Sequence, residues 1–235
     1  MTDALVVLQC RMGSRRLPGK ALSDVCGRSL LARCIDRLRL AAVAPVLVAT
    51  TTGAEDDAVV AEARRLGVDV YRGARDHVLE RFVMAARRYG ARLLVRATAD
   101  NPAVDIDAPG RVLTAARAHG ADHVTEQGLP YGAAVEAVSV AALETALTFS
   151  RDAYDHEHVT PFIIRRPERF RVVPVVAPEG LRRPELRLTV DTREDLLFMR
   201  QVLAAAAPAD GSPATLAAII QAADRIRRLP LEGAA

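Results

Sequence analysis

The sequence of 235 residues has few aromatic residues, no tryptophan and only three cysteines. Three cysteines without a CxxC pair exclude a disulfide scaffold and a zinc-finger spacing, and are typical of reduced thiols. No run of about 18 apolar residues is present, so the sequence predicts no membrane span. Its first residues lack the basic region that opens a signal peptide, and we expect a cytoplasmic protein with no membrane partner.

Lysine is almost absent as well. Of the 32 lysine and arginine residues, Lys20 is the only lysine. The 29 acidic residues are spread along the chain and leave a net charge of +3, without the basic stripe that nucleic-acid binding requires. Because arginine is the usual cation of this chain, the single lysine raises the question of what an ammonium group does at position 20.

Half of the residues are hydrophobic, and short apolar runs alternate with amphipathic segments of helix length. The alternation over residues 4–120 predicts an α/β fold with a mainly parallel, Rossmann-like sheet and helices on both faces. After about Ala121 the pattern changes, and we interpret the rest as an elaboration of the same single domain. Strands are predicted over 4–10, 45–51, 68–71, 92–97, 134–140, 170–176 and 186–190, and helices over 29–42, 54–66, 77–89, 108–119, 140–149, 156–165, 193–205 and 215–226.

A loop rich in arginine and glycine, residues 11–20, follows the first predicted strand directly. Gly13 and Gly19 let the backbone approach a ligand, and the loop's three arginines and Lys20 repel one another unless an anion lies among them. A polyphosphate meets both conditions; the alternative is a solvated basic loop. The loop is not a Walker A motif, because five residues separate its glycines and Ala21 follows the lysine, and no GxGxxG is present.

Two aspartates come at the ends of predicted strands. Asp100 follows the strand 92–97, and Asp191 follows the strand 186–190. In an open α/β sheet, ligands bind beyond the carboxyl ends of the strands. Carboxylates facing a phosphate loop need a cation between them, and Mg²⁺ is the ion that binds carboxylates together with phosphate oxygens. The alternative for Asp100 is an Asx turn before Pro102.

Two further patterns have weaker functional interpretations. Asp105 and Asp107 form a DxD, the spacing of a metal site in many sugar-nucleotide glycosyltransferases, but the helix start at Pro109 favours Asp107 as an N-cap. His156 and His158 are two apart and do not share a helix face, so they do not indicate zinc. A substrate contact and a structural role both stay open for these histidines.

Residues 11–20, RMGSRRLPGK, resemble the R-x-x-S-x-R-x-P-G-K signature of the CTP-dependent cytidylyltransferases that make CMP-sugars, such as CMP-Kdo and CMP-sialate synthetases. The likeness is greatest to the spore-coat polysaccharide cytidylyltransferase group and to enzymes that activate small phosphonates. It extends to TADNP at 98–102, EHVTP at 157–161 and LTVDTREDL at 188–196. The resemblance implies a nucleotide-diphospho-sugar transferase fold, Mg²⁺, CTP as substrate and a homodimer.

The resemblance also implies roles for individual residues. It makes 1–120 a nucleotide-binding core, 121–206 an acceptor and dimerisation elaboration, and 207–235 a C-terminal helix. The implied catalytic residues are Lys20, Arg11 and Arg16, and the implied metal ligands are Asp100 and Asp191. The implied nucleotide-binding residues are Arg11, Gly13, Ser14, Arg16, Lys20, Thr50, Thr51, Arg72, Asp76 and Arg81. The implied acceptor-binding residues are Arg96, Asn101, Glu136 and His158.

The sequence departs from the family where a glycine is common, at Ala99, and where a glutamate or cysteine is frequent, at Asn101. Few polar residues surround Glu136, which favours a small anionic acceptor, a phosphonate or a sugar acid. The expected reaction is attack on the α-phosphate of CTP with release of pyrophosphate. A glycosyltransferase of the same fold, using Asp105 and Asp107, and a non-catalytic nucleotide-binding protein are the alternatives.

Overall fold

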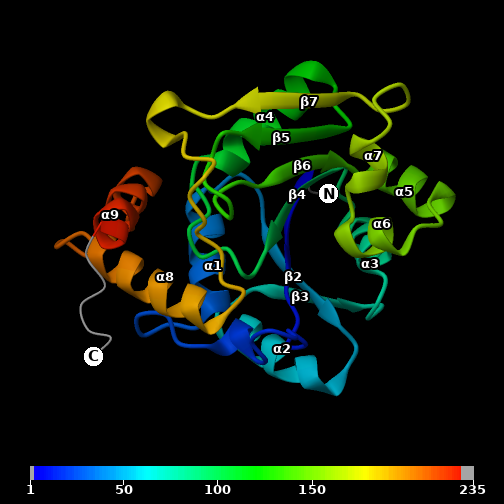
Figure 1. Ribbon diagram of the computed structural model, residues 1–235. Helices are drawn as coiled ribbons and strands as arrows, with labels where there is room; N and C mark the ends of the chain where they lie inside the picture. Colours follow the sequence, from blue (N-terminus) through cyan, green and yellow to red (C-terminus); the bar gives the residue numbers. More distant parts are fainter. Residues whose placement is uncertain (1–2, 229–235) are drawn as a thin grey trace.

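The computed structural model describes residues 3–228, which include a seven-stranded sheet of order β3-β2-β1-β4-β6-β5-β7 (Figure 1). Neighbouring strands among β1 to β4 pair in parallel, β6 runs antiparallel to β4 and β5, and β7 is parallel to β5. The predicted mainly parallel α/β sheet is confirmed. The strands are β1 (Ala4–Gln9), β2 (Val46–Thr51), β3 (Asp69–Gly73), β4 (Leu93–Thr98), β5 (His123–Gln127), β6 (Glu136–Ser139) and β7 (Val172–Val176).

Helices cover both faces of the sheet, and two buried hydrophobic clusters result. Along β1, Leu5 and Val7 belong to one cluster while Val6 and Leu8 belong to the other, because successive side chains of a strand point to opposite faces. Figure 1 shows α3, α5, α6 and α7 together on one side. The helices are α1 (Leu30–Leu40), α2 (Asp57–Arg65), α3 (Val78–Tyr89), α4 (Ala108–His119), α5 (Val140–Phe149), α6 (Ala153–His158), α7 (Pro161–Ile164), α8 (Arg193–Ala206) and α9 (Leu216–Arg228), with short 3-10 turns η1 (Lys20–Leu22), η2 (Ala54–Asp56) and η3 (Glu179–Leu181).

The strand predicted over 186–190 is wrong. This segment is extended, but it forms a single bridge, between Tyr131 and Arg187. The backbone N–H of Leu188 donates to the Tyr131 carbonyl and the N–H of Val190 donates to the Asp100 carbonyl, both at 2.8 Å. Its partners are therefore two turns rather than one straight strand, so no continuous ladder can form.

Two further sequence predictions need correction. The helix predicted over 156–165 is two short helices, α6 and α7, because Val159 adopts a φ of 75° and Pro161 cannot donate a helical hydrogen bond. The strand β5 has no predicted counterpart. Its sequence HVTEQ is polar, and the structure nevertheless places it inside the sheet with His123 and Glu126 buried.

The three cysteines are free thiols, two of them buried, as the reduced state predicts. Within residues 3–228 the longest and most apolar helices still fall short of what a membrane crossing requires.

Candidate active site

A cavity of about 380 Å³ lies at the carboxyl ends of β1 and β4. The loop after β1 forms one wall, residues 98–100 at the end of β4 form the floor, and Glu157 of α6 lies opposite. The position agrees with the rule that open α/β sheets bind ligands beyond the strand ends.

The arginine-rich loop is fixed from below by Asp56, at the end of η2. This carboxylate is buried and accepts hydrogen bonds from the Met12 N–H at 2.7 Å, the Thr51 N–H at 3.1 Å and the Thr51 hydroxyl at 2.5 Å. Burial alone would raise the pKa of Asp56, but these hydrogen bonds outweigh it and lower the pKa. A charged aspartate therefore anchors the loop, and Gly19, at a φ of 73°, ends it by turning the chain into η1.

Lys20, the single lysine, contacts both of the aspartates that were predicted at strand ends. Its ammonium group lies 3.2 Å from Asp100 Oδ2, 3.0 Å from Asp191 Oδ1 and 2.8 Å from the Val190 carbonyl oxygen. Burial would raise the pKa of Asp191, but the hydrogen bond and charge of Lys20, with Arg187 and Arg16, lower it. The structure thus brings the two carboxylates to one point beside the cavity.

The loop arginines lie around this point, and carboxylates compensate their charges only in part. Arg16 is exposed and contacts Asp191 Oδ1 at 3.1 Å, and Arg11 lies 3.7 Å from Glu157 across the cavity. Arg15 is exposed and has no ion-pair partner within the described part of the chain. Ser14 accepts a hydrogen bond from the Leu17 N–H at 3.3 Å, which shapes the loop. Such a cluster of cations is suited to bind an anion.

Residues predicted to bind nucleotide from β2, β3 and α3 lie beside the loop and do not line the described cavity. Arg72 donates to the carbonyls of Thr51 and Gly53 and so ties β3 to the turn after β2. Arg81 is fully buried: its Nη1 donates to the Ala74 carbonyl at 2.6 Å, and Nε and Nη2 have no partner in the described chain. Burial, with the charge of Arg11, lowers the pKa of Arg81. Thr50 and Thr51 are buried and Asp76 is exposed.

The predicted acceptor residues Arg96 and Glu136 pair across β4 and β6. Arg96 Nη1 donates to Glu136 Oε2 at 3.0 Å, and the Thr160 hydroxyl donates to the same oxygen at 3.2 Å. His123 Nε2 lies 3.8 Å from Glu136 Oε1, beyond hydrogen-bond distance. Burial would raise the pKa of Glu136, but the His123 ring and the Arg96 charge lower it to about 2.

The other two predicted acceptor residues have local contacts. Asn101 Nδ2 donates to the Thr98 hydroxyl at 2.8 Å, while His158 is exposed at the end of α6 and its ring lies 4.3 Å from that of Tyr154. Asn101 therefore contacts Thr98, which lines the cavity, while neither Asn101 nor His158 lines it.

Asp105 and Asp107 do not form a metal site. Asp105 is buried and accepts a hydrogen bond from Arg111 Nη2 at 2.5 Å. Asp107 is exposed at the N-cap position of α4, where its side chain makes no capping hydrogen bond. Because Arg111 already pairs with the buried Asp105 carboxylate, the DxD offers a structural ion pair rather than two free ligands.

Several residues of the site are missed by sequence reasoning. Gln9 and Glu157 line the cavity, Asp56 anchors the loop, Thr160 contacts Glu136, and Arg187 contacts Asp191. Gln9 had a signal, since it is the one polar residue in the apolar run of β1. Asp56 had none, because an acidic residue at a helix start is ordinary.

Comparison with known proteins agrees with this geometry. The family model for cytidylyltransferases matches residues 5–220. The chain is 35% identical to the Bacillus subtilis spore coat polysaccharide biosynthesis protein SpsF over 202 residues, which cover 83% of this chain and 84% of that protein. It is 32% identical to the 3-deoxy-manno-octulosonate cytidylyltransferase of Geobacter sulfurreducens over 102 residues, 42% of this chain and 39% of that protein.

Solved structures share the fold. A cytidylyltransferase from Leptospira borgpetersenii superposes with a TM-score of 0.88 at 23% identity, over 99% of this chain and 100% of that chain. A CMP:2-keto-3-deoxy-manno-octonic acid synthetase complexed with CTP superposes with a TM-score of 0.65 at 20% identity, over 86% and 98% of the two chains. With the family model, these findings confirm the predicted fold and resemblance: the chain belongs to the cytidylyltransferase family and is a CTP-dependent nucleotidyltransferase.

Proposed function

We propose that the chain transfers CMP from CTP to a small anionic acceptor, either a sugar acid or a phosphonate, with Mg²⁺ as the metal and pyrophosphate as the leaving group. The observation that carries the proposal is the meeting of Lys20, Asp100 and Asp191 at one point beside a loop of cations. Relatives named as 3-deoxy-manno-octulosonate cytidylyltransferases, and a structural neighbour complexed with CTP, support it.

Asp100 and Asp191 are suited to hold the metal. One ammonium group contacts an oxygen of each carboxylate, so both already face a single cation. Carboxylate oxygens completed by substrate phosphates are the ligands that Mg²⁺ takes in such sites. A bound Mg²⁺ would neutralise charge that develops on the phosphate oxygens.

The loop cations would hold the triphosphate. Arg11 and Arg16 have forked guanidinium groups that suit two phosphate oxygens at once, and the exposed Arg15 adds a third positive charge. Lys20 carries a compact charge on a flexible stem, which can follow the α-phosphate as the acceptor oxygen forms its bond and pyrophosphate leaves. These fixed cations favour a transition state that carries more charge on its oxygens than the ground state does.

Arg96, Glu136 and Thr160 would receive the acceptor. The charge of Arg96 is matched by Glu136, so this part of the site offers hydrogen bonds and one balanced ion pair rather than excess positive charge. This balance favours a sugar acid, whose hydroxyls can use Glu136 as an acceptor of hydrogen bonds. A sugar hydroxyl must lose its proton as it attacks the α-phosphate, whereas a phosphonate oxygen is already anionic and needs only positioning.

The same proposal assigns different roles to different segments of the chain. Residues 1–120 would supply the nucleotide site, and 121–206 would supply Glu136, His158 and Asp191. The family resemblance also supports a homodimer. Light scattering on the purified chain would then give twice the monomer mass of 25.3 kDa, and the monomer mass would refute the dimer.

The direct test is a pyrophosphate-release screen. The four ribonucleoside triphosphates are combined with sugar acids, phosphonates and phosphates, with Mg²⁺ or with a chelator. We expect release only with CTP, an anionic acceptor and a divalent ion together. Turnover of a nucleotide sugar without pyrophosphate would instead support a glycosyltransferase, and CTP binding without turnover of any acceptor would support a binding protein.

A further inference from the structure

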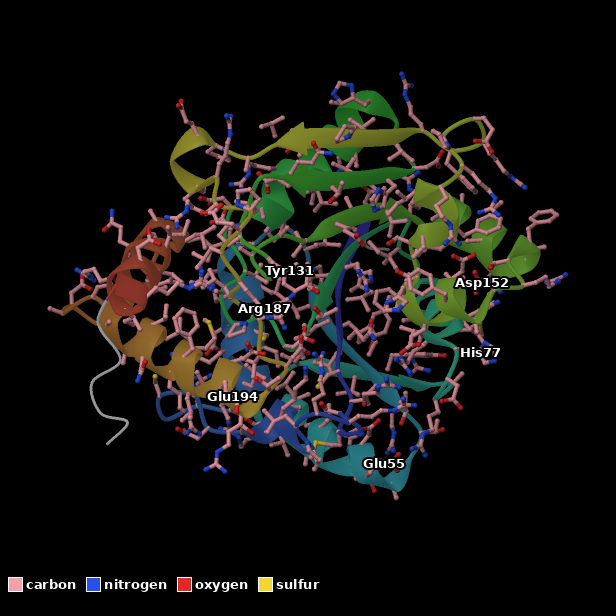
Figure 2. The ribbon with its side chains drawn as sticks, viewed as in Figure 1. Glu55, His77, Tyr131, Asp152, Arg187 and Glu194 are labelled. Atoms are coloured by element: carbon pink, nitrogen blue, oxygen red, sulfur yellow. The ribbon has the colours of Figure 1, made fainter. Side chains whose placement is uncertain are left out.

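Arg187 contacts Asp191 from the side opposite Lys20. Figure 2 shows it close to Tyr131, above the start of α8. Its Nη2 donates to Asp191 Oδ2 at 2.5 Å, and its Nε lies 3.6 Å from Asp195 Oδ1. The guanidinium carbon lies 5.1 Å from the centre of the Tyr131 ring. The fork is thus held by two carboxylates and an aromatic face at once.

The two oxygens of Asp191 have different partners as a result. Oδ1 faces Lys20 at 3.0 Å and Arg16 at 3.1 Å, toward the cavity, whereas Oδ2 is taken by Arg187. The backbone before and after Asp191 is also fixed, since Asp195 Oδ2 accepts from the N–H groups of Asp191 and Thr192 at 2.9 and 3.0 Å. Arg187 therefore sets the rotation of a carboxylate whose backbone is already in place.

Stability alone does not explain this arrangement. The Arg187 side chain is 39% exposed, and ion pairs at such exposure typically contribute between 0 and about 1 kcal/mol. Side chains that hydrogen-bond to a metal-binding carboxylate orient it instead, and their loss typically weakens metal binding about 10- to 100-fold.

We propose that Arg187 is a positioning residue that holds Oδ2 of Asp191 and so presents Oδ1 to the divalent ion. The Tyr131 ring, over which the guanidinium group lies, keeps that group in its orientation. The inference rests on the proposed metal role of Asp191. The sign of the effect is diagnostic: a nearby positive charge opposes a divalent ion, so removing a merely electrostatic Arg187 would tighten metal binding. Removing a positioning Arg187 would weaken it.

The test is Mn²⁺ binding to the nucleotide-free protein, followed by water-proton relaxation, which does not depend on turnover. We expect Arg187→Met to weaken Mn²⁺ binding about 10-fold. Arg187→Lys should recover only part of it, because lysine keeps the charge but cannot span Asp191 and Asp195. Arg193→Met, which removes an exposed arginine two residues after Asp191, is the matched control and should bind Mn²⁺ as the wild type does.

Equal or tighter binding by Arg187→Met, or full recovery in Arg187→Lys, would overturn the proposal. If the wild type bound Mn²⁺ no better than Asp191→Asn both without and with CTP, the metal site of the proposed function would itself fail, which is a different result. Should Arg187→Met unfold, Tyr131→Leu keeps the charge and removes the stacked ring. It should weaken Mn²⁺ binding about 2- to 5-fold, as loss of an exposed cation–π contact implies, and no loss would overturn the proposal.

Discussion

The two ends of the site differ in how their charges are compensated. At the phosphate end, the exposed Arg15 has no acidic partner within the described chain, and Arg11 has only Glu157, at 3.7 Å. At the acceptor end, Arg96 is paired with Glu136 at 3.0 Å, and Thr160 completes the pair. Arg16 and Lys20 contact Asp191, and Lys20 also contacts Asp100, so the four cations of the loop face three carboxylates, whereas Arg96 and Glu136 balance one to one. On the proposed function, the phosphate end would bind by charge, and the acceptor end would select by hydrogen bonding and shape.

The two ends also differ in what holds them in place. Asp56 ties the phosphate loop to the end of β2 through hydrogen bonds to backbone N–H groups, so the anchoring does not use the arginine side chains. Arg96 and Glu136 instead come from paired strands, where register fixes their distance. Substitutions at the two ends should consequently affect different kinetic constants.

The largest effect is expected for Asp100→Asn, which removes a proposed metal ligand while keeping its shape. A metal supplies several kcal/mol of charge stabilisation in the transition state, so kcat should fall on the order of 10³-fold. Thermal unfolding should remain close to that of the wild type. Pyrophosphate release at the wild-type rate in Mg²⁺ would refute the metal assignment.

Lys20→Ala should come next. Loss of a fixed charge beside the reacting phosphate should lower kcat on the order of 10²-fold, with a smaller change in KM for CTP. Lys20→Arg should restore little, because a planar guanidinium does not fit where one ammonium contacts two carboxylates and the Val190 carbonyl. A change confined to KM would mean that Lys20 only binds the nucleotide.

Glu136→Gln should act on the acceptor alone. Losing a charge-assisted hydrogen bond and leaving Arg96 unpaired should raise the acceptor KM about 10-fold, with KM for CTP unchanged. The pKa of Glu136 is lowered to about 2, so the group stays ionised throughout the range where the enzyme is assayed. The acceptor KM should therefore show no titration of Glu136 between about pH 5 and pH 9, and a KM that rose steeply below about pH 5.5 would contradict this.

Arg15→Ala should have the smallest effect. An exposed cation without a partner contributes about 0.5 kcal/mol through screened attraction, which corresponds to a two- to threefold higher KM for CTP. The difference from wild type should shrink further in high salt. A tenfold change that persists in high salt would place Arg15 in a direct, desolvated contact with the triphosphate.

Much of the fold could be predicted because it depends on local patterns. Apolar runs and amphipathic periodicity give the parallel strands β1 to β4 and their helices. The polar strand β5 could not be found this way, because His123 and Glu126 become buried only through neighbours distant in sequence. The segment 186–190 has the pattern of a strand but lacks a straight partner, a fact that only the tertiary structure supplies.

The candidate site divides in the same manner. Asp100 follows from its place at the end of β4, because the topology of a parallel sheet gathers the strand ends at one edge. Asp191 was predicted at the same edge for a different reason, a strand over 186–190 that does not form; it lies there because the Val190 N–H donates to the Asp100 carbonyl. Asp56 and Arg187 do not follow from any pattern, since each acts on the site through hydrogen bonds to residues distant from it or visible only in the folded chain. The break between α6 and α7 at Val159 sets the positions of Glu157 and Thr160. It depends on a φ of 75°, which nothing in the sequence predicts for an apolar residue.

The contrast between the two ends is tested most directly by calorimetric titration of CTP in Mg²⁺ against the wild type, Arg16→Ala and Glu136→Gln. Charge recognition at the phosphate end predicts that Arg16→Ala weakens CTP binding about 10-fold, the value of one charge-assisted contact. Glu136→Gln should bind CTP as the wild type does. Unchanged binding by Arg16→Ala together with weakened binding by Glu136→Gln would contradict the assignment of the two ends.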